Sequence, residues 1–199
     1  MVIGITGARS LNATQLSTVQ EIAQQAAHAG SVYTGCALGA DAAAVAGARA
    51  ASSALRIFAV GAPDGTGFPR GYVPRHVETL GAQPGVCVSW LAGGPLSVPL
   101  VARLARRSLA MLRAVAVAGG ALVAFPAASA PPRAFGSGPF PSCGSGTWST
   151  IAAAVLLNLP VFVVFPSVPL AAQAVGGYWS ASSLFGCAGW WYVPAQGLF

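Results

Sequence analysis

Short apolar runs that alternate with helix-like segments constrain the fold of this chain more than any other feature. Runs of this kind occupy residues 2–6, 31–34 and 55–61. Between them, residues 12–28 carry polar side chains at helical spacing and residues 39–52 form an alanine-rich stretch. Strands that alternate with helices in this way pair in parallel, because each helix returns the chain to the edge where the strand began. The N-terminal part of the chain therefore predicts a βαβαβ unit.

The same alternation continues through most of the remaining sequence. Further strands are expected at residues 85–90, 121–125 and 161–165, and further helices at residues 75–80, 101–118 and 147–158. Residues 126–143 consist largely of Pro, Gly, Ser and Ala and match neither element. We therefore predict an α/β protein of the Rossmann-like, doubly wound type, with a mostly parallel sheet and helices on both faces.

The domain organisation follows from length and from the composition of the C-terminus. A chain of 199 residues can fill one core, and we expect one domain over residues 1–166. Residues 167–199 form a glycine-rich aromatic tail without charge, expected to pack on the domain or on a partner. The tail is typical of a hairpin that covers a sheet edge or of a contact between protomers. A platform on which nucleic-acid bases stack is the alternative.

Composition limits the partners and the compartment. Hydrophobic residues make up 55% and charged residues 7% of the chain, but the apolar run at residues 151–165 contains Asn158 and Pro160 and is shorter than the about 20 residues of a membrane span. We expect a soluble cytoplasmic protein with no membrane partner. Its net charge of +6, carried by arginine without lysine, favours anionic partners. Codon bias toward Ala, Gly and Arg is the alternative explanation.

Three glycine-rich loops precede predicted helices, and their small residues let backbone N–H groups approach a phosphate. The candidate binding residues in these loops are Gly7, Ala8, Arg9, Ser10, Gly35, Gly39, Asp41, Gly144, Ser145, Gly146 and Thr147. Because the carboxyl ends of parallel strands share one edge of the sheet, the three loops can converge on one pocket. Asp41 can meet a ribose hydroxyl, or it can cap the helix that begins there.

The predicted helix at residues 101–118 is cationic. Its four arginines fall at spacings that place them on one broad face: Arg103, Arg106, Arg107 and Arg113. Such a face can contact phosphates, because a guanidinium binds them with two parallel hydrogen bonds, or it can simply be solvated. No catalytic set of residues emerges from the four acids and two histidines, and the four separated cysteines predict no metal site.

The order of these motifs resembles the SLOG superfamily, which joins the DNA-processing protein DprA (Smf) to the LOG nucleotide hydrolases. The resemblance covers residues 1–166. Gly7-Ala8-Arg9-Ser10 resembles the opening G-S-R turn, and residues 34–48 resemble the segment S-G-x-A-x-G-x-D-x-x-A-H-x-x-A. Residues 145–150 resemble the S-G-[ST]-x-x-T stretch, and residues 159–166 resemble the closing strand. Of the family's R-N-R helix motif only Arg107 matches, because Ala105 and Arg106 replace its first two residues.

What the resemblance implies is a protein that binds nucleotide or nucleic-acid phosphate. DprA-like members imply single-stranded DNA binding by a homodimer, and other branches imply a bound nucleotide or nucleotide-derived signal. LOG-like members imply a nucleotide phosphoribohydrolase or another ribosyl-cleaving enzyme, and this is our alternative. In the LOG motif P-G-G-x-G-T-x-x-E the last residue is the catalytic carboxylate, and the corresponding residue here is Thr150. We therefore predict binding without catalysis, with Arg107 added to the loop residues as a candidate site residue.

Overall fold

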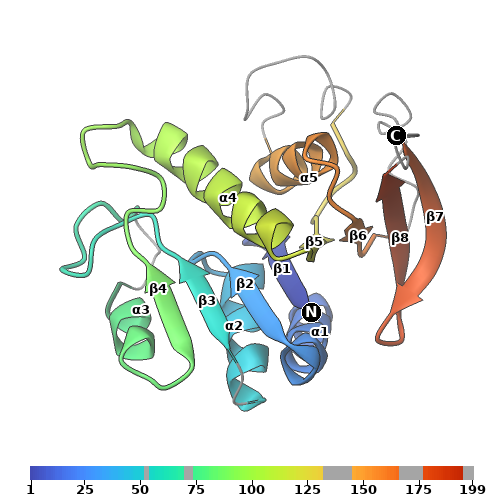
Figure 1. Ribbon diagram of the computed structural model, residues 1–199, viewed down its shortest axis with the longest axis horizontal. Helices are drawn as coiled ribbons and strands as arrows, with labels where there is room; N and C mark the ends of the chain where they lie inside the picture. The colour runs from blue at the N-terminus through green and yellow to red at the C-terminus, as the bar shows by residue number, and fades with distance from the viewer. Residues whose placement is uncertain (52–53, 70–73, 132–144, 166–176, 195–199) are drawn as a thin grey trace.

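The described residues form an eight-stranded sheet with helices packed on both faces (Figure 1). The structure is a computed structural model that describes residues 1–51, 54–69, 74–131, 145–165 and 177–194. The strands are β1 (Val2–Gly7), β2 (Ser31–Thr34), β3 (Leu55–Phe58), β4 (Val86–Ser89), β5 (Ala121–Phe125), β6 (Val161–Val163), β7 (Gly177–Leu184) and β8 (Cys187–Pro194). The helices are α1 (Ala13–Ala29), α2 (Ala40–Ala50), α3 (Pro74–Gly81), α4 (Leu100–Val117) and α5 (Gly146–Leu156).

The strand order is β4-β3-β2-β1-β5-β6-β8-β7. The first six strands in this order pair in parallel, whereas β8 pairs antiparallel with β6 and β7 pairs antiparallel with β8. The predicted fold class, a doubly wound and mostly parallel α/β sheet, is therefore confirmed. Several elements are shorter than the sequence pattern suggested: β6, for example, ends at Val163 rather than at residue 165.

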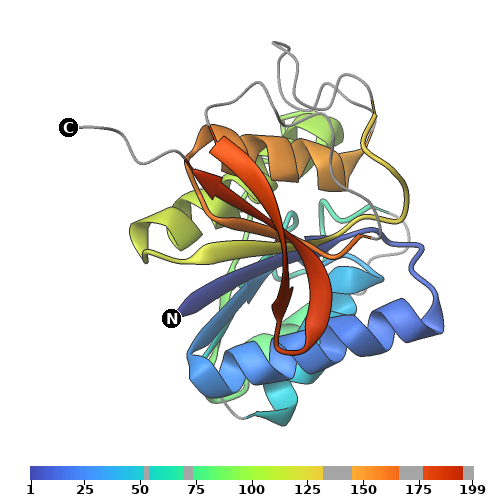
Figure 2. The same cartoon turned by 90° about the vertical axis from the view of Figure 1, so that its right-hand side faces the viewer.

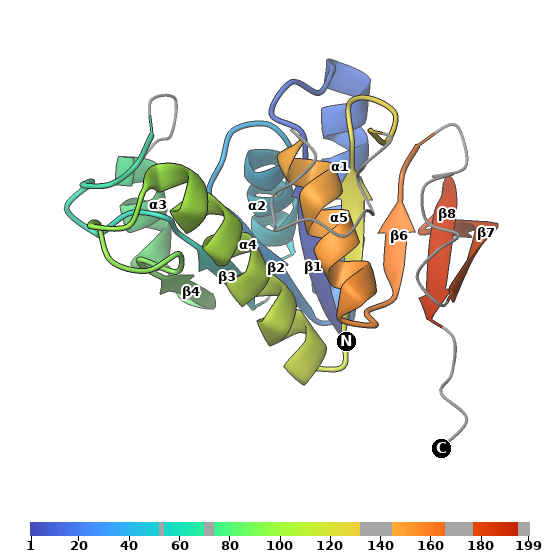
Figure 3. The same cartoon turned by 90° about the horizontal axis from the view of Figure 1, so that it is seen from above.

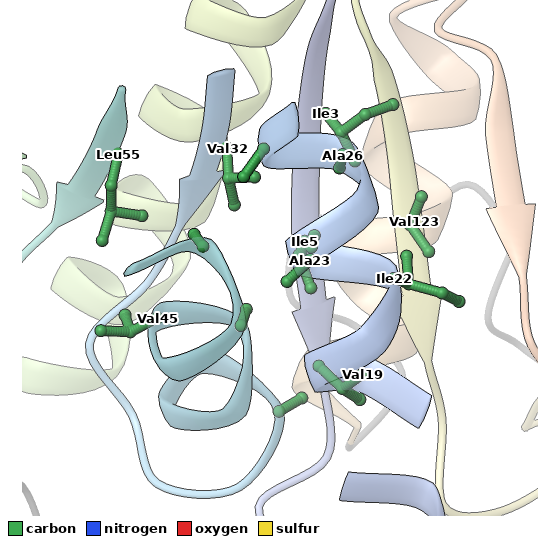
Figure 4. Close-up of a cluster of buried hydrophobic side chains, with 14 of the residues drawn as sticks. Ile3, Ile5, Val19, Ile22, Ala23, Ala26, Val32, Val45, Leu55 and Val123 are labelled. Carbon is green, nitrogen blue, oxygen red and sulfur yellow. The ribbon is translucent and has the colours of Figure 1, made fainter. Parts of the chain in front are cut away.

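Helices lie on both faces of the sheet (Figures 2 and 3), and two clusters of buried apolar side chains hold them to it. On one face, α1, α2 and α3 cover side chains of the parallel strands, and Figure 4 shows Ile22 and Ala23 of α1 gathered with Ile5 of β1 and Val123 of β5. On the other face, α4 and α5 bury a second cluster that contains Met111, Leu112, Val115, Ile151 and Val155. Because both faces of β1 and β5 are covered, these central strands are apolar along most of their length.

Side-chain caps fix where two of the helices begin. Asn12 accepts a hydrogen bond from the Gln15 backbone N–H, and the Gln15 side chain accepts one from the Asn12 N–H, which forms a capping box at the start of α1. Ser145 Oγ accepts from the Trp148 backbone N–H at 3.4 Å and caps α5. The start of α5 is therefore a defined helix terminus at the carboxyl edge of the sheet.

The aromatic C-terminal segment extends the sheet in its described part. Phe185 and Gly186 both have positive φ and connect the paired residues Leu184 and Cys187, which makes a tight two-residue hairpin. Trp191 lies opposite Phe162 of β6, and their ring centroids are 5.0 Å apart. Residues 177–194 thus form a hairpin at the edge of the sheet, which is one of the arrangements expected for the tail. Residues 167–176 and 195–199 lie outside the described part. No helix in the described part is long and apolar enough to cross a membrane.

Candidate functional site

The strand order reverses at β1, and this reversal opens a crevice at the carboxyl edge of the sheet. From β1 the chain runs outward through β2 and β3 to β4, and it then returns to β5 and β6 on the other side. The helices that follow β1 and β5 cover opposite faces, so the loops that lead into them diverge. A cavity of about 650 Å³ lies here, lined by Thr6, Gly7, Ala8, Arg9, Ser10, Ala37, Asp41, Val101, Leu104, Ala105, Arg107, Ser108, Ser145, Gly146, Thr147 and Thr150.

The loop after β1 is held by backbone hydrogen bonds on both sides. The Ala8 N–H donates to the Phe125 carbonyl of β5 at 2.9 Å, and the Ala8 carbonyl accepts from the Ala40 N–H of α2 at 3.2 Å. Gly7 is needed in this arrangement, because a Cβ there would lie 2.5 Å from Ala40 Cβ. The anchored loop leaves Arg9 and Ser10 exposed at the cavity.

Asp41 holds the second loop to α4 through a buried ion pair. Asp41 is 4% exposed, and its Oδ2 accepts from the Ala37 backbone N–H at 3.1 Å and lies 3.3 Å from an Arg107 guanidinium nitrogen. Burial raises the pKa of the Asp41 carboxyl above its usual value, whereas Arg107 and the Ala37 N–H both favour its charged form. Asp41 does not cap α2, because its oxygen binds an N–H before the helix. The helix-cap alternative is therefore wrong.

Gly35 and Gly39 do not line the cavity, although they belong to the same predicted loop. A Cβ at Gly35 would lie 1.5 Å from the Arg107 guanidinium and 2.2 Å from Asp41 Oδ2. Gly39 has a φ of +76°, and a Cβ there would lie 2.6 Å from Arg9 Cα. These two glycines leave space for the ion pair and for the first loop. They therefore allow the residues that line the cavity to pack, without lining it themselves.

The third loop contributes the start of α5. Ser145, Gly146 and Thr147 line the cavity, and Gly144 lies outside the described residues. Gly146 is the first residue of α5 and is exposed, and, apart from its chain neighbours and the backbone of α5, a Cβ there would meet no atom of the described residues within 4 Å. The first N–H groups of a helix have no partner within the helix and carry its positive dipole end. Ser145 Oγ already accepts from the Trp148 N–H, so the groups at this start that suit an anion are the N–H groups of Gly146 and Thr147.

The four arginines of α4 do not form one cationic surface, which corrects the sequence-based hypothesis. Arg106 and Arg113 are exposed, whereas Arg103 and Arg107 are 6% and 9% exposed. Arg103 donates to the carbonyls of Val98, Val60 and Gly67. Arg103 therefore joins α4 to the loop after β3, and Arg107 is the arginine of this helix that reaches the cavity.

Sequence reasoning missed one wall of the cavity. Val101, Leu104, Ala105 and Ser108 of α4 line it, as do Thr6, Ala37 and Thr150. The spacing of the α4 residues could have shown that they share a face, but nothing in the sequence shows that this face meets a cavity. Thr150 donates its hydroxyl to the Gly146 carbonyl at 2.8 Å.

Within the described ranges, no group of three or more His, Cys, Asp or Glu residues could hold a metal ion.

Together these features define a Rossmann-like α/β domain with a cavity at its topological switch point. No family model matches the sequence, and no curated protein matches it. Among solved structures, the DNA processing protein A (DprA) of Streptococcus pneumoniae matches with a TM-score of 0.59 and 16% identity, over 87% of this chain and 52% of that chain. A molybdenum cofactor carrier protein of Chlamydomonas reinhardtii matches with a TM-score of 0.36 and 17% identity, over 62% of this chain and 75% of that chain. The fold is therefore DprA-like, and this chain spans about half of the length of the DprA structure.

Proposed function

We propose that this protein binds a phosphate-bearing nucleotide in the cavity, without cleaving it. The observation that carries the proposal is the convergence of exposed Arg9 and the open start of α5 on one cavity at the switch point of a parallel sheet. Ligands of open α/β sheets bind at such switch points, and phosphates bind at helix starts where glycine lets the backbone approach.

The charges along the cavity support a position for the phosphate. Among the described lining residues, the charged side chains are those of Arg9, Asp41 and Arg107. Arg107 is paired with Asp41, so its positive charge is largely balanced. Arg9 is exposed and makes no ion pair with any described residue. The phosphate would therefore lie between Arg9 and the start of α5, with the Ser145 and Thr147 hydroxyls close by.

A single nucleotide fits this site better than a continuous strand of DNA. The cavity volume lies within the roughly 300–1,000 Å³ typical of small-molecule sites. Single-stranded DNA usually needs a basic groove that follows the backbone over several nucleotides. Among the described exposed arginines, Arg49, Arg106 and Arg113 do not line the cavity. The likeness to a DNA processing protein concerns the fold, and single-stranded DNA is the ligand that the experiment below tests as the alternative.

The polar residues of the cavity favour binding over hydrolysis. Asp41 is the one carboxylate among the described lining residues, and it is engaged by Arg107 and the Ala37 N–H. The hydroxyl of Thr150, at the position of the LOG carboxylate, donates to the Gly146 carbonyl. A ribosyl-cleaving enzyme would need a group that activates water or stabilises the leaving base. Release of free base from AMP during prolonged incubation would support the hydrolase alternative.

The test uses Gly146→Val and a matched control, Ala13→Val. Both residues are exposed first residues of a helix, but only Gly146 lines the cavity. Because a Cβ at Gly146 meets open space, the variant should fold normally while its side chain occupies the phosphate position. We expect isothermal titration calorimetry to show AMP binding to the wild type and to Ala13→Val, and at least a tenfold loss for Gly146→Val. Unchanged AMP affinity in Gly146→Val would refute the site.

The same proteins should be titrated against a labelled 20-nucleotide single strand at low and moderate salt. If the cavity is a mononucleotide site, AMP binds and the oligonucleotide binds weakly and independently of the Gly146→Val change. Tight, strongly salt-dependent oligonucleotide binding that AMP does not compete for would instead favour a DNA-binding surface.

A further inference from the structure

One apolar face of α4 continues out of the protein core and into the cavity. Met111, Leu112 and Val115 on this face are buried in the core between α4, α5 and the sheet. One to three helical turns toward the N-terminus, the same face carries Val101, Leu104, Ala105 and Ser108, which line the cavity. We call these last four residues the α4 wall.

The length of α4 explains why this face extends beyond the core. A helix of 18 residues is about 27 Å long, whereas the neighbouring strands of four to six residues span about 13–20 Å. The N-terminal part of α4 therefore extends past the strand ends, where the loops open (Figure 1). Val101 is 67% exposed there, although it lies on the helix face that is apolar in the core.

The α4 wall gives the cavity two chemically different sides. The loop after β1 and the start of α5 supply Arg9, hydroxyls and backbone N–H groups, and the α4 wall supplies mainly aliphatic carbon. Inorganic phosphate or a sugar phosphate would satisfy the first side and leave the second wet. A ligand that covers both has an anionic end and, away from it, a flat surface of low polarity such as the face of a base.

We propose that the α4 wall contacts the base of a single bound nucleotide while its phosphate lies at Arg9 and the start of α5; this rests on the proposed function. In the α4 wall only Ser108 has a side chain that forms hydrogen bonds. The wall therefore contacts the base mainly through apolar surface. The site would thus prefer a nucleoside monophosphate to ribose 5-phosphate, and a purine to a pyrimidine, because affinity increases with the apolar area covered.

The test compares AMP with ribose 5-phosphate on variants of one exposed wall residue. Val101→Ser removes aliphatic area from the wall, and Val117→Ser makes the same change at a 91% exposed position at the other end of α4. We expect Val101→Ser to weaken AMP binding roughly five- to tenfold, to leave ribose 5-phosphate affinity unchanged, and Val117→Ser to alter neither. Val101→Trp should tighten AMP binding alone, a gain that misfolding cannot produce.

The outcomes separate this inference from the proposed function. If the wild type binds AMP and ribose 5-phosphate equally and Val101 variants change neither affinity, the phosphate site stands and the α4 wall is not a base site. An equal loss of both ligands in Val101→Ser also overturns the inference, because the wall would then act on the phosphate end. If the wild type binds neither ligand, the proposed function and the inference fail together.

Discussion

Two glycine-rich loops of this protein look alike in sequence and have opposite environments. In the loop after β2, the space beside Gly35 is filled by the Arg107–Asp41 ion pair, and Gly39 packs against the backbone of Arg9. At the start of α5, no side chain or loop of the described residues comes within 4 Å of the position that a Cβ of Gly146 would take. The first loop needs glycine because its neighbours occupy the position of a side chain. The second has no such neighbour in the described part of the chain, so its glycine leaves the backbone accessible there.

This difference separates the support of the site from its binding surface. Substitutions in the filled loop should lower the stability of the protein. They should not remove a direct contact with the ligand. The open loop should tolerate substitution without loss of stability and lose binding instead. Stability and affinity measurements on matched variants therefore test whether the two loops differ in this way.

Loss of the ion pair in the filled loop should cost the protein the most stability. Arg107→Leu leaves the buried Asp41 carboxylate without its partner, and we expect it to lower the free energy of unfolding by about 3–5 kcal/mol at pH 7. Arg106→Leu, its exposed neighbour, should change it by less than about 0.5 kcal/mol. Urea denaturation of both variants measures the difference, and equal effects would show that the pair does not hold the loop.

The same variant should have a characteristic pH dependence. Burial already raises the Asp41 pKa, and loss of Arg107 removes the main opposing influence, so the pKa should rise further. The folded state then binds a proton more readily than the unfolded chain. Stability is therefore greatest below the unfolded Asp pKa of about 4 and is lost as the pH rises toward the folded value. Adding Asp41→Asn should remove this dependence; if the slope persists, another group causes it.

The same substitution, to alanine, should have opposite effects on stability at Gly35 and at Gly146. Gly35→Ala places a Cβ on the Arg107 guanidinium and should cost roughly 1–3 kcal/mol of stability through overpacking. Gly146→Ala meets open space in a helix and should leave stability unchanged or raise it by up to about 1 kcal/mol. Thermal unfolding of the pair checks the signs. A destabilised Gly146→Ala would mean that this glycine also serves packing.

The sequence predicted the fold well because the fold depends on local patterns. Apolar runs separated by helical spacing determine a parallel sheet with helices on both faces, whichever residues line its edge. The convergence of the three loops also followed, since parallel strands share a carboxyl edge. Of the candidate loop residues, the described ones line the cavity except Gly35 and Gly39.

The role of each site residue depended on contacts that spacing does not encode. Asp41 and Arg107 are 66 positions apart, and only the folded sheet brings them within 3.3 Å. Helical spacing placed Arg103 and Arg107 with Arg106 and Arg113, but which of them lie under loops depends on where α4 crosses the sheet. The α4 wall was missed for a similar reason: its residues have the pattern of a core face, and only the lengths of the helix and the strands show that this face extends beyond the core.

Removal of the exposed arginine at the cavity should not change stability and should change only ligand affinity. Arg9 makes no hydrogen bond or ion pair to the described residues, so Arg9→Ala should leave the free energy of unfolding unchanged, unlike the loss of Arg107. Its contribution should appear only with an anion bound, as a roughly five- to thirtyfold weaker affinity for AMP at low salt. Because an exposed charge is screened by ions, the difference should shrink at 0.5 M salt. Arg113→Ala, which removes an exposed arginine from outside the cavity, should lose no affinity beyond the general effect of one fewer positive charge. Equal losses for the two variants would mean that the net charge of the protein, and not a defined contact at the cavity, attracts the nucleotide.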